Sequence, residues 1–431
     1  MTRLPLEDIR IVDLTGVWAG PFATQMLADW GAEVIWVESR QILSTRQYQG
    51  PGSGGGVKGR LVSAPPDREP GERPWNRNPR VNCHARNKLS MTIDLKRPEG
   101  INVFKRLVKV SDVVMENRGP GTMEKLGIPY EVLKQVKRDI IMVRMPGFGL
   151  TGPYKDFRSF GFQIDNFAGQ AYLMGYRDCD ASQIAGSSFS DGTAGVMAAL
   201  AVLMALHHRN RTGKGQFIEL AQVETLIPYF GESIMDWTMN QSIQDKLGNR
   251  DSSAVQGCYR CKGEDRWVNI TINSDDEWEG FCRALGNPPW CKQDRFSDAL
   301  IRYKNHDELD KSIEEWTNQH DDYEVMHILQ SEGVPAGPVM DERDCYNDPH
   351  LKERGFFQKL IQADCGTHLY PGLEWKMSKT PNRIRTPPCL MGENNEYVYK
   401  QIIGVSDKEY SELEKAGHIG MDFDPLLFLD S

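Results

Sequence analysis

The sequence predicts an α/β fold in which helices cover a parallel sheet, and its first forty residues show this most clearly. Residues 9–14 form a β-branched apolar run typical of a strand, and a Thr-Gly turn leads from it into an apolar helical pattern. Pro21 suits the first turn of this helix because its missing N–H would be unpaired there, and Gly31 suits the stop. A second strand, 33–38, follows at once. This order favours a parallel sheet.

Strand and helix patterns keep alternating to about residue 220. Residues 193–206 are apolar on every side, which predicts a buried helix that is too short to cross a bilayer. Basic residues near its end complement the helix dipole, and Gly213 ends it. The other elements expected here are strands at 86–95, 113–116, 140–145 and 217–220 and a helix at 98–110.

A smaller α+β domain is expected in the middle of the chain. Between Cys258 and Ile270 two strand-like segments flank a polar turn, and helical patterns follow to about residue 330. The last helix is expected at 406–416. The length of 431 residues is consistent with two or three domains.

Composition excludes several classes of protein. A chain with 39% hydrophobic and 26% charged residues is neither collagen-like nor wholly disordered. The net charge of −9 argues against a nucleic-acid partner, so any phosphate site must be local. The N-terminus has no apolar signal region, and no uninterrupted apolar run reaches about 18 residues, which predicts a cytoplasmic protein without a membrane partner. Nine scattered cysteines fit reduced thiols.

Several short motifs carry little weight. The literal GxGxxG at Gly50, Gly52 and Gly55 has no strand before it and no helix after it, so it is interpreted as part of a long loop excursion over 43–82. Cys258 and Cys261 form a lone CxxC without partners at zinc spacing, so no metal site is expected. The pair His207-His208 is assigned to dipole compensation at a helix end.

Asp191 is the strongest candidate for chemistry. It stands between the turn-rich stretch AGSSFS and the expected buried helix, where a carboxylate would meet unpaired backbone N–H groups. The simplest interpretation is a helix cap. Small neighbours, Ser190, Gly192 and Gly195, would also permit close approach of a substrate, so a nucleophilic role is the alternative.

A set of motifs spread over the chain resembles the class III CoA-transferases, the family that includes the formyl-CoA:oxalate and carnitine CoA-transferases. The alignment implied by SDGTAG places the family's nucleophilic aspartate on Asp191, which outweighs the cap interpretation. The motifs are IVDLTGVWAGPFATQMLADWGAEVIWVE from Ile11, RNKLSMTIDLK from Arg86, ENRGPG from Glu116, MPGFGLTGPY from Met145, SDGTAG from Ser190, RTGKGQ from Arg211 and GVPAGPV from Gly333.

The resemblance implies a fold and an assembly that composition does not show. The family fold has a large Rossmann-like domain built from both ends of the chain and a smaller α+β middle domain, with two chains interlocked as a dimer. We therefore expect residues 1–225 and 351–431 in the large CoA-binding domain and 226–350 in linker helices and the small domain. Members can pair two homologous chains, so a heteromer is expected as the alternative to a homodimer.

The chemistry implied by the resemblance is CoA transfer through covalent aspartyl intermediates, with coenzyme A as substrate and product. A carboxylate that displaces a thiolate expels a group about 4.6 pKa units more basic, roughly 6 kcal/mol uphill. Backbone N–H donors at the developing oxyanion and retained binding energy of CoA offset this cost.

The resemblance also assigns residues to CoA binding. The loop 17–19 would contact the phosphates or pantetheine at a helix start, and cations along the chain would hold the nucleotide. The complete set is Val17, Trp18, Ala19, Ser39, Arg40, Lys88, Ile93, Asn117, Arg118, Lys125 and Arg158.

Departures from the family pattern bear on the substrate. Trp18 stands where several relatives carry a smaller or amide side chain, and the glycine-run loop of the formyl-CoA enzymes is absent. The pattern is closer to the subgroup of benzylsuccinate CoA-transferase subunits, with succinyl-CoA as donor and an aromatic or dicarboxylic acid as acceptor. The alternatives are an acyl-CoA racemase or intramolecular CoA isomerase of the same fold, and a CoA-binding subunit without activity of its own.

Overall fold

The computed structural model describes residues 3–42, 46, 65–184, 186–251 and 253–428. The GxGxxG at Gly50, Gly52 and Gly55 and most of the expected excursion over 43–82 lie outside the described residues. The chain forms two compact units. The first contains residues 1–169, 186–232 and 353–431, and the second contains 170–185 and 233–352. The expected domain limits differ from these units mainly at residues 170–185, which were expected in the large domain and belong to the second unit.

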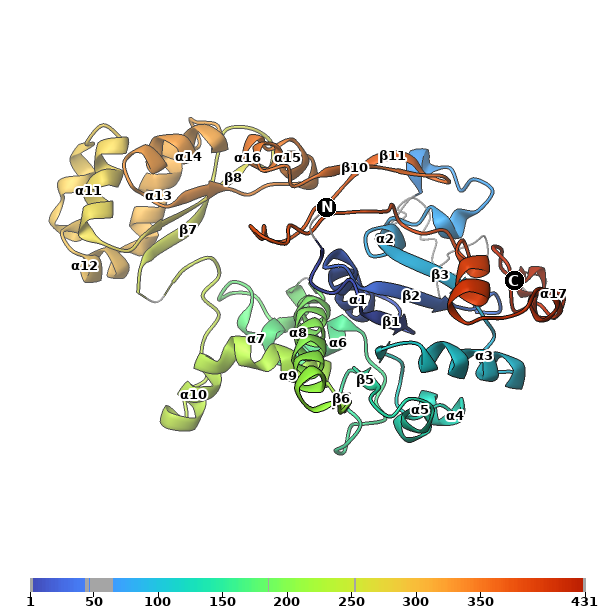
Figure 1. Cartoon of the computed structure of the whole chain (residues 1–431). Helices are drawn as coiled ribbons and strands as arrows, with labels where there is room; N and C mark the ends of the chain where they lie inside the picture. The colour runs from blue at the N-terminus through green and yellow to red at the C-terminus, as the bar shows by residue number, and fades with distance from the viewer. Residues whose placement is uncertain (1–2, 43–45, 47–64, 185, 252, 429–431) are drawn as a thin grey trace. The chain divides into compact units, whose positions relative to one another are not determined.

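The first unit contains a six-stranded sheet in the order β3-β2-β1-β4-β5-β6, with every neighbouring pair parallel (Figure 1). This is the doubly wound Rossmann order, whose direction reverses between β1 and β4. The expected parallel α/β sheet is thus confirmed. Its strands are β1 Arg10–Asp13, β2 Glu33–Glu38, β3 Lys88–Thr92, β4 Val113–Glu116, β5 Ile141–Arg144 and β6 Phe217–Glu219.

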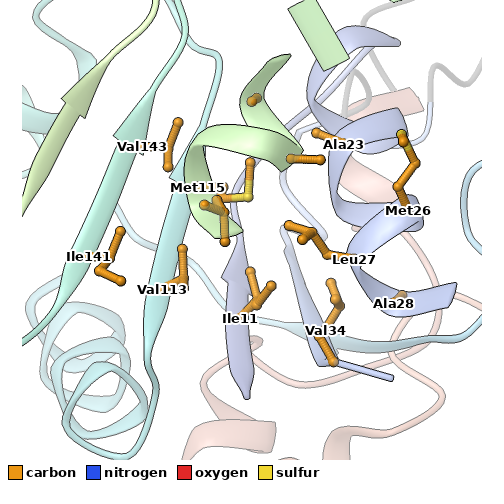
Figure 2. Close-up of a cluster of buried hydrophobic side chains, with 14 of the residues drawn as sticks. Ile11, Ala23, Met26, Leu27, Ala28, Val34, Val113, Met115, Ile141 and Val143 are labelled. Carbon is orange, nitrogen blue, oxygen red and sulfur yellow. The ribbon is translucent and has the colours of Figure 1, made fainter. Parts of the chain in front are cut away.

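Apolar side chains alternate between the two faces of this sheet, and each face is covered by its own helices. Ile11 of β1 and Val113 of β4 pack under α1 (Ala19–Asp29) and α8 (Phe189–Thr212), as Figure 2 shows for the strand and α1 side chains. The next residues along the strands, Val12 and Val114, face the opposite side. That side is covered by α3 (Pro98–Lys109), α4 (Thr122–Lys125), α5 (Tyr130–Val136), the π-helical turn Tyr397–Ile402 and α17 (Asp407–Lys415).

Helix α8 is longer than its apolar centre suggested. It covers 24 residues and ends at Gly213, whose φ of 70° is the left-handed value that glycine adopts at no steric cost. By length and composition it is long enough to cross a membrane, so the expectation of too short a helix was wrong. In the structure 56% of its apolar window is buried, mainly against α1 and the neighbouring helix α9 (Gln222–Leu226). Asp191 falls in its first turn.

The remaining elements of the first unit connect these layers. They are α2 (Pro79–Asn82), α6 (Gly161–Phe167) and the antiparallel hairpin of β10 (Gln358–Gln362) and β11 (Gly366–Tyr370). The C-terminal segment 353–431 therefore belongs to the same unit as the N-terminal strands.

The second unit is a smaller α+β body. Its core lies between a three-stranded antiparallel sheet and several helices, with Val268, Phe281 and Leu309 fully buried. The hairpin expected around the CxxC motif is present, with Cys258 on its first strand and Cys261 just after it. Its elements are α7 (Gln170–Leu173), β7 (Val255–Arg260), β8 (Trp267–Ile272), β9 (Ala336–Pro338), α11 (Asp275–Ala284), α12 (Ala299–Lys304), α13 (His306–Thr317), α14 (Asp322–Ser331), α15 (Glu342–Asn347) and α16 (Pro349–Glu353), with α10 (Gly231–Asn240) at the boundary.

Candidate active site

The loops after β1 and β4 meet at the point where the strand order reverses. The Asn117 side chain binds the backbone of Gly16 twice, accepting from its N–H and donating to its carbonyl, both at 2.8 Å. Arg118 donates to the carbonyl of Leu14 at 3.1 Å. In doubly wound sheets ligands bind at the carboxyl ends of the strands at this reversal. The sequence-predicted residues Asn117 and Arg118 therefore shape the edge of the crevice through the loop that follows β1.

This loop turns sharply into α1. Val17 has a φ of 69° and is half exposed, and Trp18 beside it is 40% exposed. Helix α1 starts at Ala19 and has no side-chain cap at its N-terminus. In this first turn Pro21 has no N–H and the Phe22 N–H binds the Trp18 carbonyl, so among the described residues the Ala19 and Gly20 N–H groups are left for other partners.

A buried polar network holds this start of α1 in place. Asp13, the last residue of β1, accepts hydrogen bonds from Thr15 and Thr24. Lys88 donates to Asp13 at 3.1 Å, to the Pro21 carbonyl at 3.0 Å and to Thr24 at 2.7 Å. All three N–H donors of the Lys88 ammonium therefore bind acceptors inside the protein. Lys88, which the sequence predicted to contact CoA, thus holds the start of α1 in place.

Asp191 reaches the same loop from α8. Its Oδ1 accepts a hydrogen bond from the Ala19 N–H at 3.2 Å, and the residue is 8% exposed. Burial raises the pKa of the Asp191 carboxyl from its ordinary value of 3.8 to about 6; the Ala19 hydrogen bond lowers it, and the negative charge of Asp165 raises it further. The result is a carboxylate at the crevice that is ionised at neutral pH and more basic than an exposed one.

A different aspartate caps α8. Asp165 accepts from the N–H groups of Phe189 at 3.1 Å and Ser190 at 3.0 Å, while Ser188 at the N-cap position adopts a left-handed φ of 51°. The capping function considered for Asp191 therefore belongs to Asp165, on α6. Because Asp165 already accepts from these N–H groups, the Asp191 carboxylate does not cap α8 and instead accepts from the Ala19 N–H at the start of α1. No local sequence signal marks Asp165, which lies 26 residues upstream.

Glycines leave room for this arrangement. A Cβ at Gly161 would collide with Oδ2 of Asp191 and with the Ser188 side chain. A Cβ at Gly195 would lie 2.8 Å from a ring carbon of Phe22 and 3.0 Å from the Ala19 carbonyl. These two glycines let α6 and α1 approach α8 closely, which brings the carboxylate to Ala19.

The other sequence-predicted residues lie further along the carboxyl edge of the sheet. Arg40 follows β2 and donates to backbone carbonyls of the C-terminal segment, including Asp422 at 2.7 Å. Ser39 is buried beside it, and Ile93 is buried in the core of the first unit. Lys125 on α4 and Arg158 in the segment before α6 are exposed.

Two pockets flank this edge. The first encloses about 280 Å³, counting the part open to solvent, and is lined by Val17, Pro21, Trp36, Arg80, Val81, His84 and Lys88. The second encloses about 860 Å³ by the same measure and is lined by Leu95, Lys96, Arg97, Pro98, Ile101, Asn102, Lys125 and Leu126.

Sequence reasoning missed several of these pocket residues. Lys96 ends the quoted motif RNKLSMTIDLK and Arg97 follows it directly, so their position in a cationic run before Pro98 was a usable signal. Arg80 lies in the turn-rich stretch assigned to the excursion over 43–82, and His84 follows just after it; no pattern marked either residue. The His84 ring centre lies 6.3 Å from that of Trp18.

Comparison with known proteins agrees with this fold. Residues 6–395 match CoA-transferase family III. The chain is 31% identical over 412 residues to a succinyl-CoA–D-citramalate CoA-transferase of Chloroflexus aurantiacus, covering 95% of this chain and 97% of that one. It is 30% identical over 416 residues to the beta subunit of a succinyl-CoA–L-malate CoA-transferase of the same organism, covering 96% and 97%.

A solved structure shares the fold over nearly the whole chain. A CaiB/BaiF family protein from Brucella suis superposes with a TM-score of 0.80 at 26% identity, covering 93% of this chain and 100% of that one. The chain therefore belongs to CoA-transferase family III and is a class III CoA-transferase.

Proposed function

We propose that this enzyme moves CoA from a short acyl-CoA donor, with succinyl-CoA as the leading candidate, to a carboxylic acid, using Asp191 as the nucleophile. The observation that carries the proposal is the Asp191 carboxylate, buried at the reversal point of the sheet and held by the Ala19 N–H. The donor is inferred from the two relatives, whose names specify succinyl-CoA.

The first half of the reaction loads CoA onto the enzyme. An Asp191 oxygen attacks the thioester carbonyl carbon, the C–S bond breaks, and CoA leaves as a thiolate beside an aspartyl–acyl anhydride. The thiolate then attacks the Asp191 side-chain carbonyl. This step forms aspartyl-CoA and releases the donor acid as a carboxylate.

The second half of the reaction transfers CoA to the acceptor and restores the free Asp191 carboxylate. The acceptor carboxylate attacks aspartyl-CoA and again expels the CoA thiolate, giving a second anhydride. The thiolate attacks the acceptor's carbonyl carbon, so the new acyl-CoA departs and the free Asp191 carboxylate is restored. No net proton is consumed, and ping-pong kinetics are expected.

Burial makes the first attack easier. An aspartate with a pKa of about 6 lies closer in basicity to a thiolate with a pKa of about 8.5, so the uphill difference falls from roughly 6 to about 3 kcal/mol. The Gly20 N–H follows the Ala19 N–H that binds Asp191, and it would stabilise the oxyanion by about 3 to 4 kcal/mol.

We place the phosphates of CoA in the second pocket. Lys96, Arg97 and Lys125 supply positive charge there, and α3 begins at Pro98 within the same lining. A helix start together with cations is suited to phosphate. Wild-type enzyme should discriminate against 3′-dephospho-CoA thioesters, and Lys125→Ala should lower that discrimination. If wild type uses CoA and 3′-dephospho-CoA thioesters equally well, the proposal that the second pocket binds the CoA phosphates is refuted.

We further propose that the enzyme assembles with a second copy of itself or with a homologous chain. The side chains of Val196, Met197, Leu200 and Met204 form an apolar stripe on α8 and are between 43% and 64% exposed in the single chain. Light scattering should give about twice the 48.9 kDa chain mass, and Met204→Glu should lower it. A monomeric wild type would favour pairing with a homologous subunit, as the name of the beta-subunit relative indicates for that protein.

The nucleophile is tested by trapping. Purified enzyme is incubated with succinyl-CoA, then treated with hydroxylamine, and peptides containing Asp191 are examined by mass spectrometry for the hydroxamate. Acceptors screened in parallel are D-citramalate, L-malate and benzylsuccinate. Asp191→Ala should lose the label and at least about 10³-fold of the transfer rate. An unlabelled Asp191 in an active wild type, or full activity in Asp191→Ala, would refute the proposal.

A further inference from the structure

The Asn117 side chain holds the loop between β1 and α1 at Gly16. Its amide accepts from the Gly16 N–H and donates to the Gly16 carbonyl, in the manner of a hydrogen-bonded pair in an antiparallel sheet. Both distances are 2.8 Å, although 101 residues separate Asn117 from Gly16 in the sequence. Thr15, the residue before Gly16, is bound in turn to the Asp13 carboxylate. The loop is therefore fixed as far as Gly16.

The next residue, Val17, has a strained backbone. Its φ of 69° lies in the left-handed region, which a β-branched residue rarely adopts because its Cβ crowds the backbone. Such a conformation persists only where the surrounding structure enforces it. The Val17 side chain is 49% exposed, so its own burial contributes little to holding the turn. The hydrogen bonds on either side, at Gly16 and at Ala19, are placed to enforce it.

The turn at Val17 determines where the first N–H of α1 lies. Ala19 follows two residues later, and its N–H binds Oδ1 of Asp191 at 3.2 Å. This distance is at the long end of the usual range for N–H···O bonds, so a displacement of a few tenths of an ångström would break the contact. Burial raises the pKa of Asp191 to about 6 and the Ala19 N–H opposes this effect, so loss of the bond would raise the pKa further.

We propose that Asn117 is a positioning residue, which holds the strained turn at Val17 in the form that presents the Ala19 N–H to Asp191. The inference rests on the proposed function, because it takes Asp191 as the group that attacks the thioester. It differs from the CoA contact that the family resemblance implied for Asn117, since the amide oxygen and the amide N–H₂ group are both directed to Gly16. Without this amide the turn relaxes toward negative φ, and the Ala19 N–H moves away from the carboxylate.

The test is a double-mutant cycle of Asn117→Ala and Val17→Gly. Glycine adopts a φ of 69° without steric cost, so Val17→Gly removes the strain that the amide opposes. The rate of Asp191 labelling is measured against succinyl-CoA concentration and against pH in wild type, in each single variant and in the double variant. Asn117→Ser is made beside Asn117→Ala, so that the same comparison is available if the alanine variant does not fold.

The matched control is Asn395→Ala. Asn395 is a buried amide that also binds backbone groups of the first unit. It accepts from the Thr92 N–H at 2.8 Å and donates to the Gly420 carbonyl at 3.3 Å. Melting temperatures of all variants are recorded, so that a general loss of stability is separated from an effect on Asp191.

Asn117→Ala should lower the labelling rate at saturating succinyl-CoA by about 10- to 100-fold. The midpoint of its pH profile should rise by about one pH unit, the effect of losing one hydrogen bond to a charged group. In the Val17→Gly background the loss should be at least about threefold smaller, because the two residues are coupled through the turn. Asn395→Ala should lower the melting temperature and leave the midpoint unchanged.

Two results would overturn the inference. One is a higher succinyl-CoA concentration for half-maximal labelling in Asn117→Ala with an unchanged maximal rate and midpoint, which would assign Asn117 to CoA binding instead. The other is an equal loss of rate with and without Val17→Gly, which would show that the amide does not oppose the strain at Val17. Failure of the proposed function has a different signature, because then no acyl-CoA labels Asp191 in wild type, and the inference falls with it.

Discussion

The Oδ1 atom of Asp191 accepts a hydrogen bond from the Ala19 N–H at 3.2 Å, although 172 residues separate the two along the chain. This contact joins the start of α8 to the loop at the reversal point of the sheet. It places a buried carboxylate beside the N–H groups that begin α1. The proposed nucleophile and the candidate oxyanion donor Gly20 N–H are therefore fixed by the packing of two helices.

Asp191 should control the pH dependence of enzyme labelling. Its carboxyl must be ionised to attack, and its raised pKa of about 6 places this ionisation inside the working range. The labelling rate with a saturating acyl-CoA should rise about tenfold from pH 5 to pH 7 and then level off. Rapid-quench measurements across this range check it. A rate that is flat from pH 5 to pH 8 would contradict a pKa of about 6 for the attacking Asp191 carboxylate.

The same burial predicts that the ionised Asp191 carboxylate lowers the stability of the fold. The pKa of Asp191 is higher in the folded state than in the unfolded state. Its contribution to the free energy of unfolding is therefore most favourable below about pH 3.8 and is lost as the pH rises through about 6. Ionised Asp191 then costs about 3 kcal/mol, two pKa units at about 1.36 kcal/mol each. Asp191→Asn keeps an acceptor for Ala19 and should raise the melting temperature at pH 8. The gain should shrink at pH 5; an equal gain at both values would contradict the assignment.

Gly161→Ala should impair catalysis by moving the carboxylate. The added methyl group would meet Oδ2 of Asp191, while the first turn of α6 accepts alanine without backbone strain. A displacement of this kind is expected to lower kcat by about 10- to 100-fold. Gly231→Ala is the control, because a Cβ there meets nothing within 4 Å. Steady-state kinetics on both variants decide the matter, and equal activities would leave Gly161 without this role.

Asp165→Asn should separate capping from electrostatics. Asp165 accepts the Phe189 N–H through Oδ2 and the Ser190 N–H through Oδ1. Asparagine has one side-chain oxygen and loses one of these bonds, so the replacement should lower stability by about 1 kcal/mol. The negative charge of Asp165 also raises the pKa of Asp191, so the midpoint of the labelling profile should move to lower pH. Melting curves and pH profiles are recorded beside Asp156→Asn, an exposed aspartate of the preceding loop. A loss of stability with an unmoved midpoint would limit Asp165 to capping.

Local patterns in the sequence were enough to predict most of the first unit. Alternating apolar strands with β-branched residues, Gly31 after the first helix and Gly213 after α8 predicted elements that the structure contains. These signals are local because strand pleating and helix termination depend on neighbouring residues. The length of α8 was underestimated, since its polar ends, with Asp191 at one and His207-His208 in the last turns of the other, remain helical.

The sequence by itself determined the family, through motifs distributed along nearly the whole chain, and it singled out Asp191 by its setting of small residues. Only the tertiary structure decided what that carboxylate touches. Its contact with Ala19, the capping of α8 by Asp165 and the clearance at Gly161 join α1, α6 and α8, which are distant in sequence. The structure likewise turned Lys88 toward Asp13, a partner 75 residues away in the sequence. Side-chain partners of this kind depend on how helices and strands pack, and no window of neighbouring residues encodes them.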